Sequence, residues 1–485
     1  MTAADTTDLP PSTDQQGTVA LVVLAAGAGS RMRSALPKPL HPVAGVPMTR
    51  LVLEAGMAAR PSSVTLVVSA QTAAVVDALN VDYDVKSVIQ DPPRGTGEAV
   101  ALALETVGDA RWVVVLFADH PLLTPDVVER FVAGAQAQRG LVTVLTCSVP
   151  DGAAYGRIAR DDLGRPVRVV ERKGDDPALR TGAVEINSGM MVIDAAWARV
   201  AVTRLQPSAA SGEYYLTDLV ELAVADGSAA GGVWPVATVA AEPDVALGIN
   251  DRVQLAEADA IARERIRRRH MMAGVTIVAP ETVIIDADVT IGKDTTVHPF
   301  SVIQAGSVIG ERCVVGPHAV LSRARLGDDV DVRSSTITDS VVAAGTDVGP
   351  YAHLRGGSCV GPGVHVGNYA EINRSIIEEG VKMAHFSYLG DARVGARTNI
   401  GAGAITCNFD GQRKHRTEIG PDVFIGSDSM LVAPLTIGAG ARTGAGSVVT
   451  KDVPPGATVV GVPARVVRTR STSPDGSEGG GDRDE

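Results

Sequence analysis

A glycine-rich turn near the start of the chain is accompanied by two basic side chains. The stretch LAAGAGSRM, residues 24–32, follows an apolar run, and Lys38 comes shortly after it. The glycines let backbone N–H groups approach an anion, and Arg31 and Lys38 bring cations to it. This arrangement suits a nucleotide triphosphate that is cleaved, because the charge at phosphorus must then be neutralised. A tight turn with two surface cations is the alternative, and the motif alone does not decide between them.

The same turn nearly matches the dinucleotide fingerprint G-x-G-x-x-G. Met32 stands where the third glycine of that fingerprint belongs. Arg31 also places a cation in a turn that dinucleotide-binding folds leave neutral. The stretch is therefore either a degraded dinucleotide site or a different phosphate site.

A carboxylate, Asp119 in the stretch FADHP, follows another apolar run. Ligands of parallel sheets bind at the carboxyl ends of the strands, which is where both this stretch and the glycine-rich turn are expected. We therefore interpret Asp119 as a candidate ligand for a metal ion that accompanies phosphates. A turn or cap residue is the alternative role.

A histidine, His385, lies in the stretch MAHFSYLGDA among a tyrosine and several amides. A neutral imidazole can remove a proton from an amine as the amine attacks a thioester, so His385 is a candidate general base. Backbone N–H groups could stabilise the oxyanion of such an N-acetylation. The alternative is a structural histidine, which is the more common role of a lone one.

Length, composition and charge limit the classes of protein to which this chain can belong. At 485 residues the chain exceeds one ordinary core, and its net charge of −12 argues against a general nucleic-acid binder. Its four cysteines are far apart, which fits a reducing compartment without structural zinc. Residues 1–16 do not have the pattern of a signal peptide, and no apolar run is long enough to span a bilayer. We expect a cytoplasmic protein with no membrane insertion and with disordered tails at 1–16 and 468–485.

The first half of the chain, residues 17–248, alternates apolar runs with helical segments. VALVVLAA, VTLVVSA and RWVVVLFADH are such runs, and TGEAVALALETV has helical spacing. Near-continuous Val/Leu strands separated by helices predict an α/β, Rossmann-like domain with a parallel sheet buried on both faces.

The second half, residues 275–467, repeats an aliphatic residue every six positions. The register runs through Ile285, Ile291, Val297, Ile303, Ile309, Val315 and Leu321, and it resumes at Val348 and at Ile419. Small residues such as Ser301 and Ser307 follow four positions after an aliphatic one. A period of six fits neither a lone helix nor a hairpin and predicts a parallel β-helix.

Residues 249–274 are expected to form one connecting helix, capped by Asn250 or Asp251 and ended by Gly274. Its arginines, Arg263, Arg265, Arg267, Arg268 and Arg269, could be a nucleic-acid patch. Acidic residues interleave with them, so a solvated helix face is the better interpretation.

Taken together, the motifs resemble one family. LAAGAGSRM with Lys38 is followed by QDPPRGTGEA, FADHPLL, YGRI, VERK, EINSGMMV, GEYYLTDL and GIND, and then by the hexapeptide repeats. In this order they resemble the bacterial bifunctional N-acetylglucosamine-1-phosphate uridyltransferase/glucosamine-1-phosphate N-acetyltransferase, over residues 19–467. The resemblance implies a left-handed β-helix, a homotrimer, and synthesis of UDP-N-acetylglucosamine for cell-wall precursors. Acetyl-CoA would acetylate glucosamine 1-phosphate, and UTP would then uridylylate the product with release of pyrophosphate.

The resemblance also implies roles for individual residues. The catalytic residues would be Lys38 and His385, and the Mg²⁺ ligands would be Asp119 and Asn250. The nucleotide and its sugar would contact Leu24, Ala26, Gly27, Arg31, Lys38, Gln90, Gly95, Thr96, Gly156, Glu171, Asn187 and Asn250. Glucosamine 1-phosphate would contact Arg355, Asn373, Tyr388 and Asn399. Acetyl-CoA would contact Ala402, Asn408, Phe409, Ser427, Ala445 and Arg465, with Lys414 nearby on a loop ejected from the β-helix.

Four positions depart from the family pattern. Phe117-Ala118 replaces Tyr-Gly, Phe409 replaces a tyrosine, and Asn373 replaces the lysine that pairs with the substrate phosphate. A lost charge-assisted hydrogen bond costs about 1.5–3 kcal/mol. Neighbouring residues of a strand point to opposite faces, so Arg374 is not expected to replace the lysine. We hypothesise weaker binding of glucosamine 1-phosphate, or a compensating cation from another coil or subunit.

Two other functions fit parts of the sequence. The chain could be a nucleotidyltransferase for another sugar whose β-helix is catalytically weak or only oligomerises; Asn373 favours this, and His385 with Tyr388 count against it. It could also be a trimeric scaffold with an inactive nucleotide domain. The joint presence of Lys38, Asp119 and Asn250 argues against the scaffold.

Overall fold

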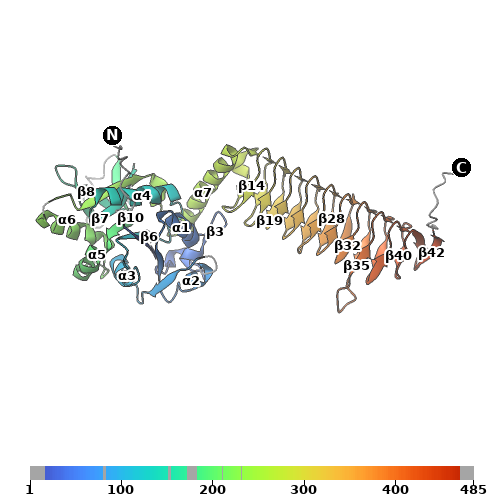
Figure 1. The fold of residues 1–485 in the computed structure, drawn as a ribbon, viewed down its shortest axis with the longest axis horizontal. Helices are drawn as coiled ribbons and strands as arrows, with labels where there is room; N and C mark the ends of the chain where they lie inside the picture. The colour runs from blue at the N-terminus through green and yellow to red at the C-terminus, as the bar shows by residue number, and fades with distance from the viewer. Residues whose placement is uncertain are drawn as a thin grey trace, which may run out of the picture. The chain divides into compact units, whose positions relative to one another are not determined.

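The computed structural model describes residues 17–79, 83–150, 155–171, 183–209, 211–230 and 232–469. They belong to two compact units that divide between Ala262 and Arg263, within helix α7 (Arg252–Met272) (Figure 1). The expected tails at 1–16 and 468–485 lie outside the described residues, except that residues 468 and 469 are in a β-strand at the C-terminal end of the described chain, where the expectation of disorder is wrong. Among the residues that are described, no helix is long and apolar enough to cross a bilayer.

Unit 1 is built on a mixed sheet with the order β11-β7-β10-β6-β1-β4-β5, and β8 and β9 are attached to β10. The strands are β1 (Val19–Leu24), β4 (Ser63–Val68), β5 (Lys86–Ile89), β6 (Trp112–Phe117), β7 (Val142–Val149), β8 (Arg157–Arg160), β9 (Pro166–Val170), β10 (Val184–Asp194) and β11 (Val236–Ala241). The expectation of a parallel sheet is wrong at β10, which runs antiparallel to β6 and β7. Its apolar run resembles those of the parallel strands, because β10 is also covered on both faces.

Helices cover both faces of this sheet. Alternate residues of β1 belong to two separate cores, with Leu21 and Val23 in one and Ala20 and Val22 in the other. The first core also contains residues of α1 (Met48–Gly56), α2 (Ala74–Leu79) and α4 (Pro125–Gln138), and the second contains residues of α3 (Thr96–Ala103), α5 (Ala195–Ala201) and α6 (Leu219–Ala230). Because the helices cover the two faces of the sheet, the carboxyl ends of the central strands β1 and β6 carry loops at one edge of the sheet.

Unit 2 is a β-helix, as the period of six predicts. Successive short strands form three parallel sheets, which begin with β12 (Thr276–Ile277), β13 (Ile284–Ile285) and β14 (Thr290–Ile291). We call them the β12, β13 and β14 sheets. Figure 1 shows the stacked coils and a loop that leaves the stack beside β35 (Thr417–Ile419). The stack ends in a hairpin of β41 (Ala457–Gly461) and β42 (Ala464–Thr469).

Small residues turn the corners of the coils, as expected. Thr295, Ser301 and Ser307 are fully buried beside the aliphatic residues of the coil interior. The Thr295 hydroxyl donates to the Gly310 carbonyl at 2.9 Å and accepts from the Cys313 N–H at 3.0 Å. Such bonds satisfy the corner backbone, and a larger side chain would not fit inside the coil.

The arginine cluster of α7 has a structural role. Arg263 donates to the Ile285 carbonyl and to Asp286, each at 3.0 Å, and Arg267 donates to the Val283 carbonyl at 3.3 Å. Arg269 donates to the Ala287 carbonyl at 3.0 Å. The interpretation as a solvated face is therefore wrong for Arg263, Arg267 and Arg269, because the first coil has carbonyl groups that no preceding coil can bond. Arg268 is exposed, in agreement with that interpretation.

His270 near the end of α7 makes the stability of unit 2 sensitive to pH. The side chain is buried, and its Nε2 atom has no hydrogen-bond partner within the described part of the chain. Burial and the charge of Arg269 lower the pKa of His270 from 6.5 to about 4. The folded state thus binds this proton more weakly than the unfolded state, and the associated stability is present above pH 6.5 and is lost as pH falls toward 4.

The free energy of unfolding of the parent protein is expected to fall between pH 7.5 and pH 5. In His270→Leu this fall is expected to be smaller by about 2 kcal/mol, because the buried histidine is absent. Urea unfolding followed by circular dichroism measures this difference. All three tryptophans belong to unit 1, so tryptophan fluorescence on the same samples serves as the control for that unit. Equal losses in the two proteins would show that His270 is already protonated, or not buried, in the folded protein.

Candidate active sites

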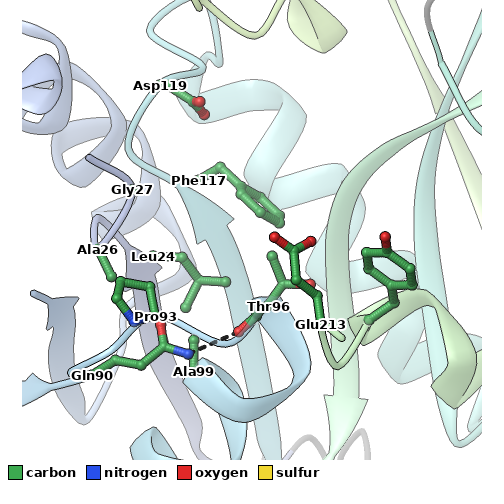
Figure 2. A pocket seen from close by; sticks show the side chains of 12 residues that line it. Leu24, Ala26, Gly27, Gln90, Pro93, Thr96, Ala99, Phe117, Asp119 and Glu213 are labelled. Carbon is green, nitrogen blue, oxygen red and sulfur yellow. Dashed lines mark hydrogen bonds between the residues drawn. The ribbon is translucent and has the colours of Figure 1, made fainter. Parts of the chain in front are cut away.

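A pocket opens at the carboxyl ends of β1 and β6 in unit 1. Leu24, the last residue of β1, pairs with Phe117, the last residue of β6, so the loops after both strands meet at one level. The residues that line the pocket are Leu24, Ala26, Gly27, Gln90, Pro93, Gly95, Thr96, Ala99, Phe117, Asp119, Glu213 and Tyr215 (Figure 2). The structure therefore brings six of the predicted nucleotide-site residues together here, with the predicted metal ligand Asp119.

The glycine-rich turn has the backbone that its sequence requires. Gly29 has φ 62°, and a Cβ atom there would lie 2.4 Å from the Lys38 Cβ. The turn continues into a single 3₁₀ turn, Ser30–Met32, rather than into an α-helix, and Met32 is buried. The third glycine of a dinucleotide finger serves close packing of a helix on a strand, and this chain has no helix there to pack. The dinucleotide interpretation is therefore excluded.

Two basic side chains, Lys38 and Arg31, contact two side chains that offer oxygen atoms, Asp119 and Asn250, beside the pocket. The Lys38 Nζ donates to Asp119 Oδ2 at 2.5 Å and to Asn250 Oδ1 at 3.3 Å. Arg31 Nη2 donates to the same Asn250 oxygen at 2.8 Å. A backbone bond from the Ile249 N–H to the Asp119 carbonyl, 3.0 Å long, holds these distant parts of the chain together.

Asp119 is ionised in this cluster. Burial by itself raises its pKa, but the charges and hydrogen bonds of His120 and Lys38 outweigh burial and hold the pKa well below its usual range. The His120 Nδ1 atom lies 2.8 Å from the second carboxylate oxygen. The sequence analysis missed His120, although it directly follows Asp119 in FADHP.

The same cluster has a donor set that fits a divalent metal ion. The Asp119 carboxylate and the Asn250 amide oxygen both converge on one cationic atom, the Lys38 Nζ. Carboxylate and amide oxygens are hard ligands, which Mg²⁺ prefers. In the part of the chain that the structure describes, no group of three or more His, Cys, Asp or Glu side chains could hold a metal. Two protein ligands are typical of Mg²⁺ that takes its other ligands from substrate phosphates and water.

Gln90 is held in one orientation. Its Nε2 donates to the Gly95 carbonyl at 2.9 Å, drawn as a dashed line in Figure 2, and to Glu98 Oε2 at 2.8 Å. Burial raises the pKa of Glu98, but hydrogen bonds from Gln90 and Arg94 and the charge of Arg94 lower it overall, so Glu98 is an acceptor. Both donor hydrogens of Gln90 are thereby occupied, which leaves its Oε1 as the group for a ligand.

Three predicted sugar contacts form a second group in unit 1. The Asn187 N–H donates to the Gly156 carbonyl at 2.8 Å, and a Cβ atom on Gly156 would lie 3.4 Å from Glu171 Oε2. Glu171 accepts from Thr217 Oγ1 at 3.2 Å, two residues beyond Tyr215, which lines the pocket. Glu171 therefore contacts the segment that includes Tyr215 of the pocket wall.

The sequence analysis assigned no role to several residues that line the pocket. Pro93 and Ala99 flank the predicted Gln90, Gly95 and Thr96 in QDPPRGTGEA, and Glu213 and Tyr215 belong to GEYYLTDL. Their membership in these motifs was the available signal. Phe117 was noted only as a departure from tyrosine, and the structure places its ring in the pocket wall.

One corner of the β-helix collects the predicted base and several acetyl-CoA contacts. His385 is exposed between β30 (Lys382–Met383) and β31 (Ser387–Gly390), where the chain passes from the β12 sheet to the β13 sheet. Backbone bonds link this corner from coil to coil, from Gly403 to Phe386, from Asp428 to Ala402 and from Gly446 to Ser427, at 2.7–2.8 Å. Ala402, Ser427 and Ala445 therefore continue the row that begins at His385. Asn399 lies just before this corner, in β33 (Asn399–Ile400).

The remaining predicted sugar-phosphate contacts lie along the β13 sheet. Arg355 of β25 (His353–Arg355) pairs with Asn373 of β28 (Ala370–Asn373), which pairs in turn with Gly390 of β31. A Cβ atom on Gly390 would lie 2.3 Å from the Tyr388 hydroxyl and 2.8 Å from Asn408 Nδ2. Arg355 is paired with Glu371, at 2.9 Å from Nε to Oε1.

The expectation that Arg374 points away from Asn373 is wrong. Arg374 follows the end of β28 and has φ 48°, a left-handed backbone, so the alternation of a strand does not apply to it. Its Nη1 donates to Asn373 Oδ1 at 3.2 Å, and its Nε and Nη2 donate to Asp391 at 2.7 and 2.9 Å.

The ejected loop and the C-terminal hairpin hold the other predicted residues. The loop lies between β34 (Ile405–Cys407) and β35, and Phe409 and Lys414 form an antiparallel bridge across it. The Phe409 ring is exposed. Arg465, in β42, donates to the carbonyls of Pro463 and Ala464 at 3.4 and 3.0 Å. These contacts do not test its role toward acetyl-CoA, which stays a prediction.

An α/β domain with a triphosphate-type turn, followed by a hexapeptide β-helix, defines a two-domain transferase. Residues 21–180 match the MobA-like NTP transferase domain, and residues 288–323 and 416–451 match the bacterial transferase hexapeptide. Proteins named "Bifunctional protein GlmU" match almost the whole chain. The protein of Alkalilimnicola ehrlichii is 40% identical over 90% of this chain and 92% of its own length. The protein of Azotobacter vinelandii is 42% identical over 91% and 95%, respectively.

The chain therefore belongs to the GlmU family. It is a bifunctional enzyme with uridyltransferase and acetyltransferase activities, and the resemblance found in its motifs is confirmed.

Proposed function

We propose that unit 1 uses UTP and Mg²⁺ to convert N-acetylglucosamine 1-phosphate to UDP-N-acetylglucosamine, and that unit 2 uses acetyl-CoA to make that substrate from glucosamine 1-phosphate. The convergence of Lys38, Asp119 and Asn250 beside the pocket supports the first assignment most strongly. The cytoplasm, which supplies UTP and acetyl-CoA, is the proposed location.

In the uridylyl transfer, an oxygen of the sugar 1-phosphate attacks the α-phosphorus of UTP, and the bond from that phosphorus to pyrophosphate breaks. Lys38 and Arg31 neutralise the phosphates during this step. Leu24, Ala26 and Gly27 contact the uridine and the phosphates, and backbone N–H groups of the glycine-rich turn hold the phosphates. Mg²⁺ bound by Asp119 and Asn250 would add positive charge to the phosphates. Gln90, Gly95 and Thr96 bind the uracil.

The sugar end of the nucleotide is assigned to Gly156, Glu171 and Asn187. Glu171 offers a carboxylate to the sugar hydroxyls, and Asn187 offers its amide. Their bonds to one another and to Thr217 hold them in place before substrate arrives.

The fixed orientation of Gln90 predicts selection for uracil. Uracil presents an N–H donor at N3, which the free Gln90 Oε1 can accept, whereas cytosine presents an acceptor there. We expect Glu98→Gln to lower the preference for UTP over CTP about tenfold, because the Gln90 amide can then turn over. Pyrophosphate release with each nucleotide measures the ratio of kcat/KM values.

Glu105→Gln is the matched control for this prediction. Glu105 is exposed just beyond the end of α3, and its replacement is expected to leave the ratio unchanged. A ratio that is also unchanged in Glu98→Gln would show that Glu98 does not orient Gln90.

In the acetyl transfer, His385 takes a proton from the amine of glucosamine 1-phosphate as the nitrogen attacks the thioester carbon of acetyl-CoA. The carbon–sulfur bond then breaks, and coenzyme A leaves as a thiol after receiving a proton. The residues that bind glucosamine 1-phosphate are Arg355, Asn373, Tyr388 and Asn399. The residues that line the acetyl-CoA site are Ala402, Asn408, Phe409, Ser427, Ala445 and Arg465.

A homotrimer is the proposed assembly. Three rings are exposed along the corner that carries His385: Tyr351 is 58% exposed, Tyr369 61% and Phe386 60%. The rings of Tyr351 and Tyr369 are stacked, with centroids 5.2 Å apart. An ordered row of exposed aromatic rings is typical of an interface. Light scattering on the purified protein measures the oligomeric state.

A two-part assay tests the proposed function. Pyrophosphate release is measured from UTP with N-acetylglucosamine 1-phosphate and Mg²⁺, and thiol release from acetyl-CoA with glucosamine 1-phosphate. Both signals are expected. Loss of the second signal alone would favour a nucleotidyltransferase with an oligomerising β-helix, which is the alternative that Asn373 suggests.

A further inference from the structure

The position where the family has a phosphate-binding lysine is occupied here by Asn373, which is buried. The neighbouring surface nevertheless holds a basic pocket. Its lining residues are Gly356, Gly357, Arg374, Ser375, Ile376, Asp391, Lys414, His415 and Arg416. Arg374 comes from the corner after β28, and the other cations come from the ejected loop. A cation, Arg374, therefore lies one residue away from position 373 and lines this pocket.

The backbone of Arg374 makes this possible. Its left-handed conformation turns the guanidinium back onto Asn373, with Nη1 3.2 Å from the amide oxygen. Because the Asn373 oxygen accepts this bond, the amide N–H₂ group faces the other way and remains a donor. An arginine and an oriented amide are therefore placed side by side.

Opposing charges leave the pocket positive. Arg374 is paired with Asp391, whose pKa is lowered chiefly by the hydrogen bonds from Arg374 and further by Asn408 and by the charge of Lys414. Arg416 is paired with Glu418, and His415 with Asp410. Among the ion pairs of the described residues, none includes Lys414. The wall of the pocket therefore offers the planar guanidinium of Arg374 and the positive charge of Lys414, which forms no ion pair among the described residues, and the two together suit a phosphate group.

A purely structural role is the competing explanation for Arg374. At the same corner, three coils earlier, Arg323 pairs with Asp339 through the Nε and Nη2 atoms of its guanidinium group. Both arginines have a left-handed backbone. Arg374 differs in two respects: its third nitrogen reaches the side chain of Asn373, and it lines the pocket.

We propose that Arg374, together with the amide of Asn373, binds the phosphate of glucosamine 1-phosphate and so replaces the family's lysine. The inference rests on the proposed acetyltransferase function of unit 2. It also removes the need for a cation from another subunit at this position.

Arg374→Gln tests the proposal, with Arg323→Gln as the matched control. Loss of a charge-assisted hydrogen bond to the phosphate is expected to raise the KM for glucosamine 1-phosphate by about tenfold or more in Arg374→Gln, with a smaller change in kcat. Arg323→Gln removes the same kind of coil-to-coil pair and is expected to leave this KM unchanged. Adding Asn373→Lys to Arg374→Gln is expected to restore the KM, which the loss of a structural pair would not allow.

Calorimetric titration with glucosamine 1-phosphate provides a readout that does not depend on catalysis. Weaker binding by Arg374→Gln than by Arg323→Gln supports the proposal. Equal binding by the two variants, or no rescue by Asn373→Lys, would overturn it. If the parent protein binds glucosamine 1-phosphate but releases no thiol from acetyl-CoA, the proposed acetyl transfer fails while the phosphate site stands. If the parent protein does not bind this ligand, both are wrong.

Discussion

Replacing Asp119 with asparagine is expected to lower kcat/KM for pyrophosphate release by about 10³-fold, because the metal and Lys38 both depend on this carboxylate. Asparagine keeps the shape of the side chain but removes its charge. The ionised carboxylate contacts Lys38 on one oxygen and His120 on the other. The Lys38 side chain is 12% exposed, so its ammonium group would lose the Asp119 carboxylate as a partner in a partly buried site. Binding of Mn²⁺ in the presence of UTP, followed by electron paramagnetic resonance, is expected to weaken in parallel.

Two controls separate this effect from misfolding. Thiol release by the β-helix of the same variant is expected to be unchanged, because unit 2 contains none of these residues. Asp126→Asn replaces an exposed aspartate in the first turn of α4 and is expected to retain pyrophosphate release. A loss of less than tenfold in Asp119→Asn would argue against its role as a metal ligand.

Replacing His385 with alanine is expected to lower the rate of thiol release by about 10²–10⁴-fold, which is the usual contribution of a general base. His385 is exposed at a corner of the β-helix, so alanine there creates no cavity and the coil should remain intact. The open position also allows rescue: added imidazole is expected to restore part of the rate. A histidine that only supports the corner would not be replaced by free imidazole.

His365→Gln is the control for His385. His365 is half-buried on the preceding coil, and its Nδ1 lies 2.6 Å from Asp347 Oδ2. Its replacement is expected to leave thiol release unchanged. Wild-type rates in His385→Ala would exclude His385 as the base, and pyrophosphate release by the same variant reports whether unit 1 is intact.

Local patterns accounted for most of what could be predicted from the chain. The spacing of six residues predicts the β-helix because each coil must bury an aliphatic residue and turn at a small one, and both requirements are local. The glycine-rich turn with Arg31 and Lys38 indicates a phosphate site because glycines let backbone N–H groups approach an anion, and Gly29 has the positive φ that only glycine adopts easily. The family resemblance implied that Asp119, Lys38 and Asn250 belong to one site, and the structure brings the three side chains together.

Two features were not accessible to such patterns. The antiparallel direction of β10 depends on the path of the chain between strands, whereas its composition reports only burial. The arginines of α7 have the composition of a solvated face, but they bind carbonyls at the open end of the first coil. That end exists only after the coils have stacked.

The sequence by itself predicted the two domains, because apolar runs and the period of six depend on spacing and residue type, and the resemblance of its motifs implied the residues expected to carry each reaction. Only the tertiary structure placed Arg374 beside Asn373. From the sequence, the replacement of lysine by Asn373 predicts weaker binding of glucosamine 1-phosphate. Strand alternation predicts that Arg374 points away from Asn373 and does not replace the lysine. A left-handed corner after β28 reverses that conclusion by turning the guanidinium onto Asn373. The direction of a side chain at a corner is set by a backbone dihedral angle, which the pattern of residues does not reveal.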